Sequence, residues 1–120
     1  MATLVPLNTF KTVASNLYTY DSVLYTTPIE TATIILTAQV SNIADESANV
    51  TLYHRSNVLT NGFRVITDTE LVKGFEVNKN DAASVIVGKI VLEESQSIIA
   101  RAGANAHLKI LVSLLETSLQ

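Results

Sequence analysis

The chain of 120 residues contains no cysteine and no tryptophan, and it has only two prolines and four glycines. Without cysteine it can form no disulfide bond and no zinc site built on thiolate ligands. The glycines are dispersed, and the sequence lacks the glycine-rich phosphate loops and nucleophile motifs typical of many enzymes. We therefore expect a protein that is not an enzyme, with no catalytic residue, no cofactor-binding residue and no cofactor.

Charged residues are also scarce, which limits the partners that the chain can bind. They make up 16% of the sequence, against about 25% in typical domains, and the net charge is −3. The eight basic residues are scattered, whereas contacts with nucleic acid or a membrane surface rely on clustered basic residues. No apolar run reaches the roughly 18 residues of a membrane span, and residues 1–6 lack a signal-peptide pattern. We expect no nucleic-acid partner, no membrane partner and no signal peptide.

A small domain exposes a large share of its surface, so a polar composition is expected for a chain of this size. The mean hydropathy of +0.31 is high for a chain of 13.0 kDa. One explanation is that other subunits cover much of this surface. The alternative is that a β-rich sequence uses Thr, Val and Ile where other proteins carry charges. The composition leaves both explanations open.

Short segments rich in Val, Ile, Leu, Thr and Tyr alternate with polar turns at intervals of about 8–12 residues, which is typical of a sandwich or barrel. The expected strands are residues 9–17, 21–26, 31–41, 49–56, 70–77, 83–92, 97–102 and 107–116. They predict an all-β fold, a single-domain antiparallel β-sandwich over residues 1–120, jelly-roll-like and with about eight strands. Residues 1–8 are expected to form an extended N-terminal arm. The pattern does not separate a jelly roll from another sandwich topology.

Two predicted strands carry apolar residues on both faces. In residues 31–41 the period-two pattern buries Ala32, Ile34, Leu36, Ala38 and Val40, which leaves Ile35 on the opposite face. In residues 107–116 it buries Leu108, Ile110, Val112 and Leu114, which leaves Leu111 and Leu115 outside. Exposed apolar surface often marks an interface. Ile35, Leu111 and Leu115 are therefore the candidate interface residues.

The histidines and carboxylates do not form a recognisable metal motif. His54 and His107 lie in predicted strands, and no H-E-x-x-H pattern supplies the further ligands that zinc requires. The pairs Asp45-Glu46 and Glu93-Glu94 fall in predicted turns, where they could bind calcium, but the EF-hand pattern is absent. We interpret them as solvated turn residues and expect no metal site.

Tyr18, Tyr20 and Tyr25 form a local cluster of aromatic residues. Packing across neighbouring strands is the common role of such residues. Exposed rings also bind sugars, so these three tyrosines are candidate glycan contacts. They favour an alternative function, a module that binds a carbohydrate or another receptor.

Several short motifs follow one another between residues 20 and 116. They are Leu24-Tyr25-Thr26-Thr27-Pro28, Ala32-Thr33-Ile34, Val40-Ser41-Asn42, Val50-Thr51-Leu52, Phe75-Glu76-Val77, Asn80-Asp81-Ala82, Gly88-Lys89-Ile90-Val91-Leu92-Glu93 and Ser97-Ile98-Ile99-Ala100. As an ordered set they resemble the small β-sandwich virion proteins of tailed bacteriophages, notably cyanophages. The chain departs from that family at Glu94-Ser95-Gln96, where related sequences often have a Gly-Asp turn.

The resemblance implies a non-enzymatic structural subunit of a tailed-phage virion, in the capsid decoration, neck, tail or fibre. It implies a homo-oligomer that contacts other virion proteins through the sides of the sandwich. Such a protein is made in the host cytoplasm and resides in the virion. The alternative function becomes a carbohydrate- or receptor-binding module of a phage tail or fibre, which contacts a surface glycan.

Overall fold

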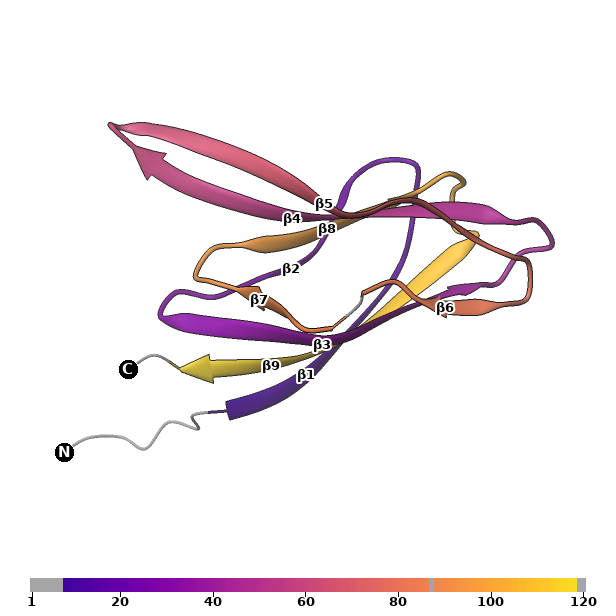
Figure 1. Ribbon diagram of the computed structural model, residues 1–120, viewed down its shortest axis with the longest axis horizontal. Coiled ribbons are helices and arrows are strands. Elements are labelled where there is room, and N and C mark those ends of the chain that lie inside the picture. Colours follow the sequence, from indigo (N-terminus) through magenta and orange to yellow (C-terminus); the bar gives the residue numbers. More distant parts are fainter. Residues whose placement is uncertain (1–7, 87, 119–120) are drawn as a thin grey trace.

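The computed structural model describes residues 8–86 and 88–118, and its regular elements in this part of the chain are all β-strands. Two antiparallel sheets face each other across the core (Figure 1). The prediction of an all-β antiparallel sandwich is therefore confirmed. The described residues include no helix long and apolar enough to cross a membrane. The expected N-terminal arm falls outside the described residues except for Asn8, which belongs to a strand.

The strand order is that of a jelly roll. Sheet A has the order β1 (Asn8–Asn16), β9 (Leu108–Ser118) and β3 (Thr31–Asn42), and both β6 (Ala82–Ser84) and β7 (Ile90–Leu92) pair with β3. Sheet B has the order β2 (Ser22–Thr26), β8 (Ser97–Ala102), β4 (Ala48–Thr60) and β5 (Phe63–Val77). Because β6 and β7 follow each other along one edge of β3, the nine strands fill eight positions.

The core between the sheets follows the predicted alternation in most strands. Leu108, Ile110, Val112 and Leu114 of β9 are buried against the partner sheet, as expected. Val50 and Leu52 of β4 are fully buried in the same cluster. This apolar layer fixes which residues each sheet turns outward, because a strand side chain can face only one of the two sides.

The prediction that Ile35 faces outward is wrong. Ile35 has no exposed surface and lies in the core, whereas Ile34 pairs with Leu115 on the outer face. The register of β3 against β9 shifts between Ile35 and Thr37, so Leu36 has no partner in β9. Such a bulge adds one residue and reverses the alternation. The odd-numbered residues therefore face inward before the bulge, and the even-numbered residues face inward after it.

Two further strand predictions differ from the structure. The strand expected at residues 83–92 is interrupted between β6 and β7, where Gly88 has a φ of +76°. Val85 still donates a backbone hydrogen bond to Ala38, at 2.9 Å, so the interrupted segment stays close to β3. The strands expected at residues 49–56 and 70–77 extend much further, to Thr60 and from Phe63.

The extension of β4 and β5 forms a hairpin that projects beyond the sandwich (Figure 1). We call residues 56–69 the distal hairpin. Its turn is Asn61-Gly62, with φ values of +51° and +82°. Two left-handed residues in a two-residue turn match the right-handed twist of the flanking strands. The turn was expected from the sequence, and it allows the alternating pattern on either side to continue as one ribbon.

Candidate interaction surfaces

A row of apolar side chains crosses the outer face of sheet A. Strand pairing places Phe10 beside Leu115, Leu115 beside Ile34, and Ile34 beside Val91. We call these four residues the apolar row. Phe10 and Val91 are 75% and 57% exposed, and the two central residues are partly exposed. The row therefore presents a continuous apolar strip on four neighbouring strands.

The rest of this outer face carries little charge. Leu111 is 45% exposed and pairs with Ala14 and Gln39, which face outward with it. Lys109, Leu111 and Ala14 line a shallow hollow of about 360 Å³. Among the described strand residues that alternate onto this face, Lys109 is the single charged one. The predicted interface residues Leu111 and Leu115 thus share one face, whereas the third, Ile35, lies inside.

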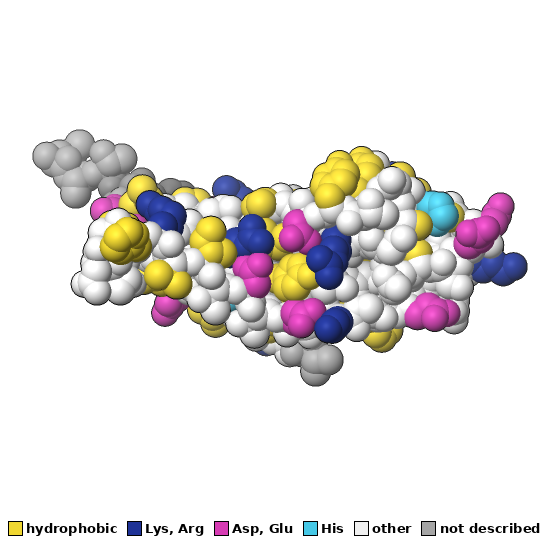
Figure 2. All heavy atoms as spheres, turned by 90° about the horizontal axis from the view of Figure 1, so that it is seen from above, with side chains coloured by type: hydrophobic (Ala, Val, Ile, Leu, Met, Phe, Trp, Pro, Cys, Tyr) yellow, Lys and Arg dark blue, Asp and Glu magenta, His cyan; other side chains and the backbone are white. Residues whose placement is uncertain are grey.

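The outer face of sheet B is different. Arg101 lies 3.6 Å from Asp21, and its guanidinium is 5.3 Å from the centre of the Tyr53 ring. Arg55 forms a two-pronged ion pair with Asp68, with N–O distances of 2.7 and 2.9 Å. Figure 2, which looks down onto the side of β4 and β5, shows basic and acidic side chains spread among the hydrophobic ones. This face has the polarity of an ordinary solvated surface.

The distal hairpin has two unlike faces. One face carries Ser56, Val58, Thr60, Phe63, Val65, Thr67 and Thr69, and the other carries Asn57, Leu59, Arg64, Ile66 and Asp68. Val58, Phe63 and Val65 are 52%, 75% and 47% exposed. Cross-strand partners point to the same side of a ribbon, so the first face is free of charge. We call it the neutral hairpin face.

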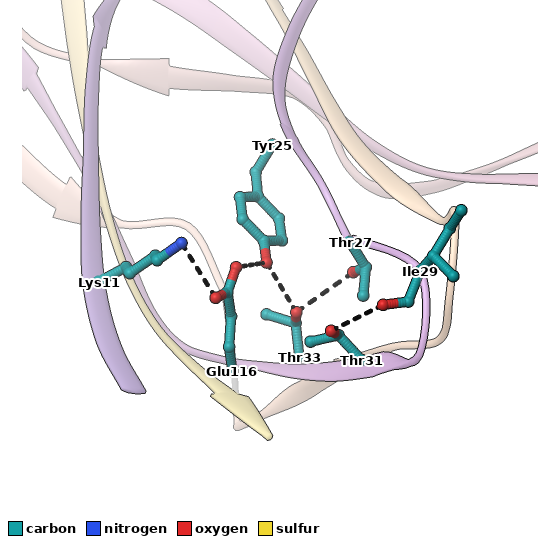
Figure 3. Close-up of polar contacts among 7 residues, drawn as sticks. All are labelled: Lys11, Tyr25, Thr27, Ile29, Thr31, Thr33 and Glu116. Carbon is teal, nitrogen blue, oxygen red and sulfur yellow. Dashed lines mark hydrogen bonds and ion pairs between the residues drawn. The ribbon is translucent and has the colours of Figure 1, made fainter. Parts of the chain in front are cut away.

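A chain of polar side chains connects the two sheets at one end of the core (Figure 3). Lys11 Nζ lies 3.0 Å from Glu116 Oε1, and the Tyr25 hydroxyl donates to Glu116 Oε2. Because the Tyr25 proton is used there, Thr33 donates to the Tyr25 oxygen, at 2.9 Å, and Thr27 donates to Thr33, at 3.3 Å. Thr27 and Thr33 are buried. The hydroxyl groups therefore form a single directed chain that ends on the carboxylate.

These contacts shift the pKa values of two groups. Burial, and then the hydrogen bond to Glu116, raises the pKa of Tyr25 to about 12. For Glu116, burial favours the neutral acid, but the hydrogen bonds from Tyr25 and Lys11 and the charge of Lys11 outweigh it. The pKa of Glu116 therefore lies below its ordinary value. The site favours a neutral phenol beside an ionised carboxylate, which is a structural arrangement.

The three candidate glycan tyrosines do not form one site. The rings of Tyr18 and Tyr20 stack with their centres 5.2 Å apart and their planes within 1°. Tyr20 is 61% exposed. The hydroxyl of Tyr25 instead reaches into the polar chain between the sheets. Of the three candidate glycan contacts, Tyr18 and Tyr20 thus lie together, and their binding of a glycan stays a prediction.

His54 contacts the turn that contains Glu93. His54 Nε2 lies 3.0 Å from Gln96 Oε1, and the same oxygen accepts the backbone N–H of Glu93 at 2.9 Å. Within residues 8–86 and 88–118, no three or more His, Asp or Glu residues lie close enough to hold a metal ion. His54 acts here as a strand residue that fixes the neighbouring turn.

Sequence reasoning missed most of the apolar row and the whole neutral hairpin face. The hairpin could have been found, because Val58 and Val65 lie at matching positions on either side of the Asn61-Gly62 turn. The row has a weaker signal. Its members come from four separate strands, and only the registers of Phe10, Ile34 and Val91 bring them together.

No protein-family model matches the chain, and no curated protein matches it in sequence. Among solved structures it is similar to a subunit of the endospore appendages of Bacillus, which are disulfide-linked pili. The two chains are 11% identical, the likeness covers 94% of this chain and 88% of the other, and the TM-score is 0.53. A chain of infectious bursal disease virus strain Gt aligns with 9% identity and a TM-score of 0.42, over 93% of this chain and 36% of the viral chain. At these identities the pilus subunit shares the fold alone, and a TM-score below 0.5 does not establish a common fold.

Proposed function

We propose that the chain is a non-enzymatic structural subunit of a tailed-phage virion, in the capsid decoration, neck, tail or fibre. In this function it assembles with copies of itself and with other virion proteins through the sides of its sandwich. The observation that carries the proposal is the outer face of sheet A. There Phe10, Val91 and Leu111 are exposed on a surface whose described strand residues include one charged side chain.

Leaving this face in contact with water costs free energy. Burial of apolar surface gains about 25 cal/mol per Å², and charged residues are depleted at the centre of protein interfaces. A face with the apolar row and few charges therefore gains from contact and has little charge to desolvate. The outer face of sheet B, with Arg101, Asp21 and the Arg55–Asp68 pair, lacks this advantage.

A likeness in sequence supports the tailed-phage assignment, and a likeness in fold supports the structural role. The ordered sequence motifs resemble small virion proteins of tailed phages, which would place the chain in such a particle. The Bacillus appendages show that a similar fold can serve as the subunit of a pilus. The cysteine-free chain cannot form the disulfide links of those pili.

Light scattering across a dilution series tests the proposal. We expect a stable oligomer, which Phe10→Ser and Leu111→Ser each weaken about tenfold or more. Val23→Ser is the matched control, because Val23 is 60% exposed on the outer face of sheet B and should leave the oligomer unchanged. A wild-type monomer at every concentration, or equal effects of all three changes, would contradict the proposal.

A second function, binding of a surface glycan at a phage tail or fibre, is favoured by the stacked Tyr18–Tyr20 pair. Tyr20 offers an exposed ring, and aromatic rings supply apolar contact area to partially polar ligands. A glycan array should then give a signal that Tyr20→Ala removes. Tyr25→Phe is the control, because its ring lies elsewhere and its hydroxyl is already engaged. An array without signal would exclude this function for the glycans it displays.

A further inference from the structure

The distal hairpin lacks an opposing layer in the described chain. β8 pairs with β4 only as far as Arg55, which lies opposite Ser97, and from Ser56 onward β4 pairs with β5 alone. The neutral hairpin face continues the side of sheet B on which Leu52 is fully buried. A two-stranded hairpin alone is at best marginally stable in water. The ribbon therefore continues the inward face of a sandwich without the second sheet that a sandwich requires.

Charge is sorted between the two faces of this ribbon. Arg64 and Asp68 both point away from the neutral face, and Arg55 lies on the same charged side at the base of the hairpin. The neutral face holds exposed Val58, Phe63 and Val65 among hydroxyl side chains. A surface that stayed in water would need no such sorting. This distribution of charge fits a face that packs against a sheet whose own surface carries few charges.

The outer face of sheet A has the matching character. It presents the apolar row, and it carries Lys109 as its one charged residue among the described strands. Sheets pack face to face at about 10 Å with interdigitated side chains. A stable interface buries about 800 Å² on each partner. The partner must therefore present an extended surface, which a two-stranded ribbon does.

We propose that the distal hairpin of one copy packs its neutral face on the outer face of sheet A of a second copy. This inference deepens the proposed function and rests on it. The two surfaces are made of different residues, so each copy donates one hairpin and receives another. A contact of this kind closes as a reciprocal twofold dimer or as a ring, or it continues as an open filament.

Aspartate substitutions on the two sides of the hairpin test the contact directly. Val58→Asp and Phe63→Asp place a charge on the neutral face, and we expect the dissociation midpoint to rise on the order of 100-fold. Ile66→Asp and Leu59→Asp are the matched controls, because these residues are 57% and 66% exposed on the charged face. These two changes should leave the dissociation midpoint within a few fold of the wild-type value. Circular dichroism and thermal unfolding show whether each variant keeps its sandwich.

Mixing two defective variants tests the direction of the contact. Phe63→Asp retains the outer face of sheet A, and the double variant Phe10→Asp, Leu111→Asp retains the hairpin. Each alone should be monomeric, and their mixture should form a one-to-one dimer that grows no further. A monomeric mixture would overturn the proposal, and so would continued assembly of either variant alone, which would indicate hairpin-to-hairpin pairing or another site.

The outcomes separate this inference from the proposed function. If the wild type is monomeric, self-assembly fails and both proposals fall. If the wild type assembles and Phe63→Asp assembles equally well, the subunit role stands and the hairpin contact is wrong. In that case the neutral hairpin face would be free for a different protein.

Discussion

Lys11 and Glu116 form an ion pair, with Nζ and Oε1 3.0 Å apart, that connects the edge strand β1 to the polar interior. The Glu116 side chain is 13% exposed and the Lys11 side chain is 50% exposed, so the pair spans from solvent to the core. Tyr25 from sheet B donates to the second oxygen of the same carboxylate. The Glu116 carboxylate in β9 thus contacts side chains from both β1 and β2.

Replacement of this carboxylate should destabilise the fold. Glu116→Gln keeps the shape of the side chain but removes the charge that Lys11 and Tyr25 both contact. Hydrogen bonds to charged groups contribute about 1.5–3 kcal/mol, so we expect a loss in that range in urea unfolding. Asp68→Asn, which breaks an exposed pair with Arg55, should cost less than about 1 kcal/mol. Equal losses would show that the Glu116 site behaves as a surface pair.

The same site predicts a loss of stability in acid. The pKa of Glu116 is lowered in the folded state, so the folded protein releases this proton more readily than the unfolded chain. The contribution is therefore complete above the ordinary value of 4.5 and is lost as the pH falls through the folded pKa. Unfolding free energies measured from neutral pH into this range should fall more steeply for the wild type than for Glu116→Gln. Parallel curves would contradict the assignment.

Tyr25 predicts the opposite behaviour in alkali. Its pKa is raised from 10.0 to about 12, so folding favours the protonated phenol. The contribution is complete below pH 10 and is lost as the pH rises through about 12. Ultraviolet difference titration of wild type against Tyr25→Phe should show one tyrosine that ionises near pH 12 while the protein remains folded. An ionisation of Tyr25 close to pH 10 would exclude the buried hydrogen bond.

The effects of mutating Ile34 and Ile35 should differ sharply although the residues are adjacent. Ile35 has no exposed surface, so Ile35→Ala leaves a cavity and should cost about 2–5 kcal/mol. Ile34 lies in the apolar row, and Ile34→Ala should cost less in the monomer and weaken assembly instead. Urea unfolding and light scattering measure the two effects. A larger loss of stability for Ile34→Ala would mean that the bulge is misplaced.

That pair also shows what the sequence could and could not predict. The strands and the Asn61-Gly62 turn follow from local preferences, which each segment carries by itself. The inward face of β3 does not, because Ile34 and Ile35 are equally apolar and the bulge after Ile35 depends on pairing with β9. A period-two pattern that runs unbroken from Ala32 to Val40 assigns half of the strand to the wrong side.

The candidate surfaces follow the same division. The regular alternation in the sequence of residues 107–116 predicts that Leu111 faces outward, and its side chain is 45% exposed. The partners Phe10 and Val91 join it on one face only through registers with distant segments, and such long-range pairing leaves little trace in a single sequence. Tyr25 was grouped with Tyr18 and Tyr20 by proximity in sequence, but its hydroxyl points into the polar chain between the sheets.

The distal hairpin should open independently of the sandwich. Gly62 has a φ of +82°, so Gly62→Ala places a side chain in the left-handed region, at a cost of about 1–2 kcal/mol. The described residues 56–69 contribute nothing to the buried core cluster, so this cost should fall on the hairpin alone. Hydrogen exchange should quicken at its amides in the monomer while the urea midpoint of the whole protein stays constant. Asn61→Gly is the control, because glycine accepts the left-handed φ at that position. A fall in global stability equal to the local one would show instead that hairpin and sandwich unfold as one cooperative unit.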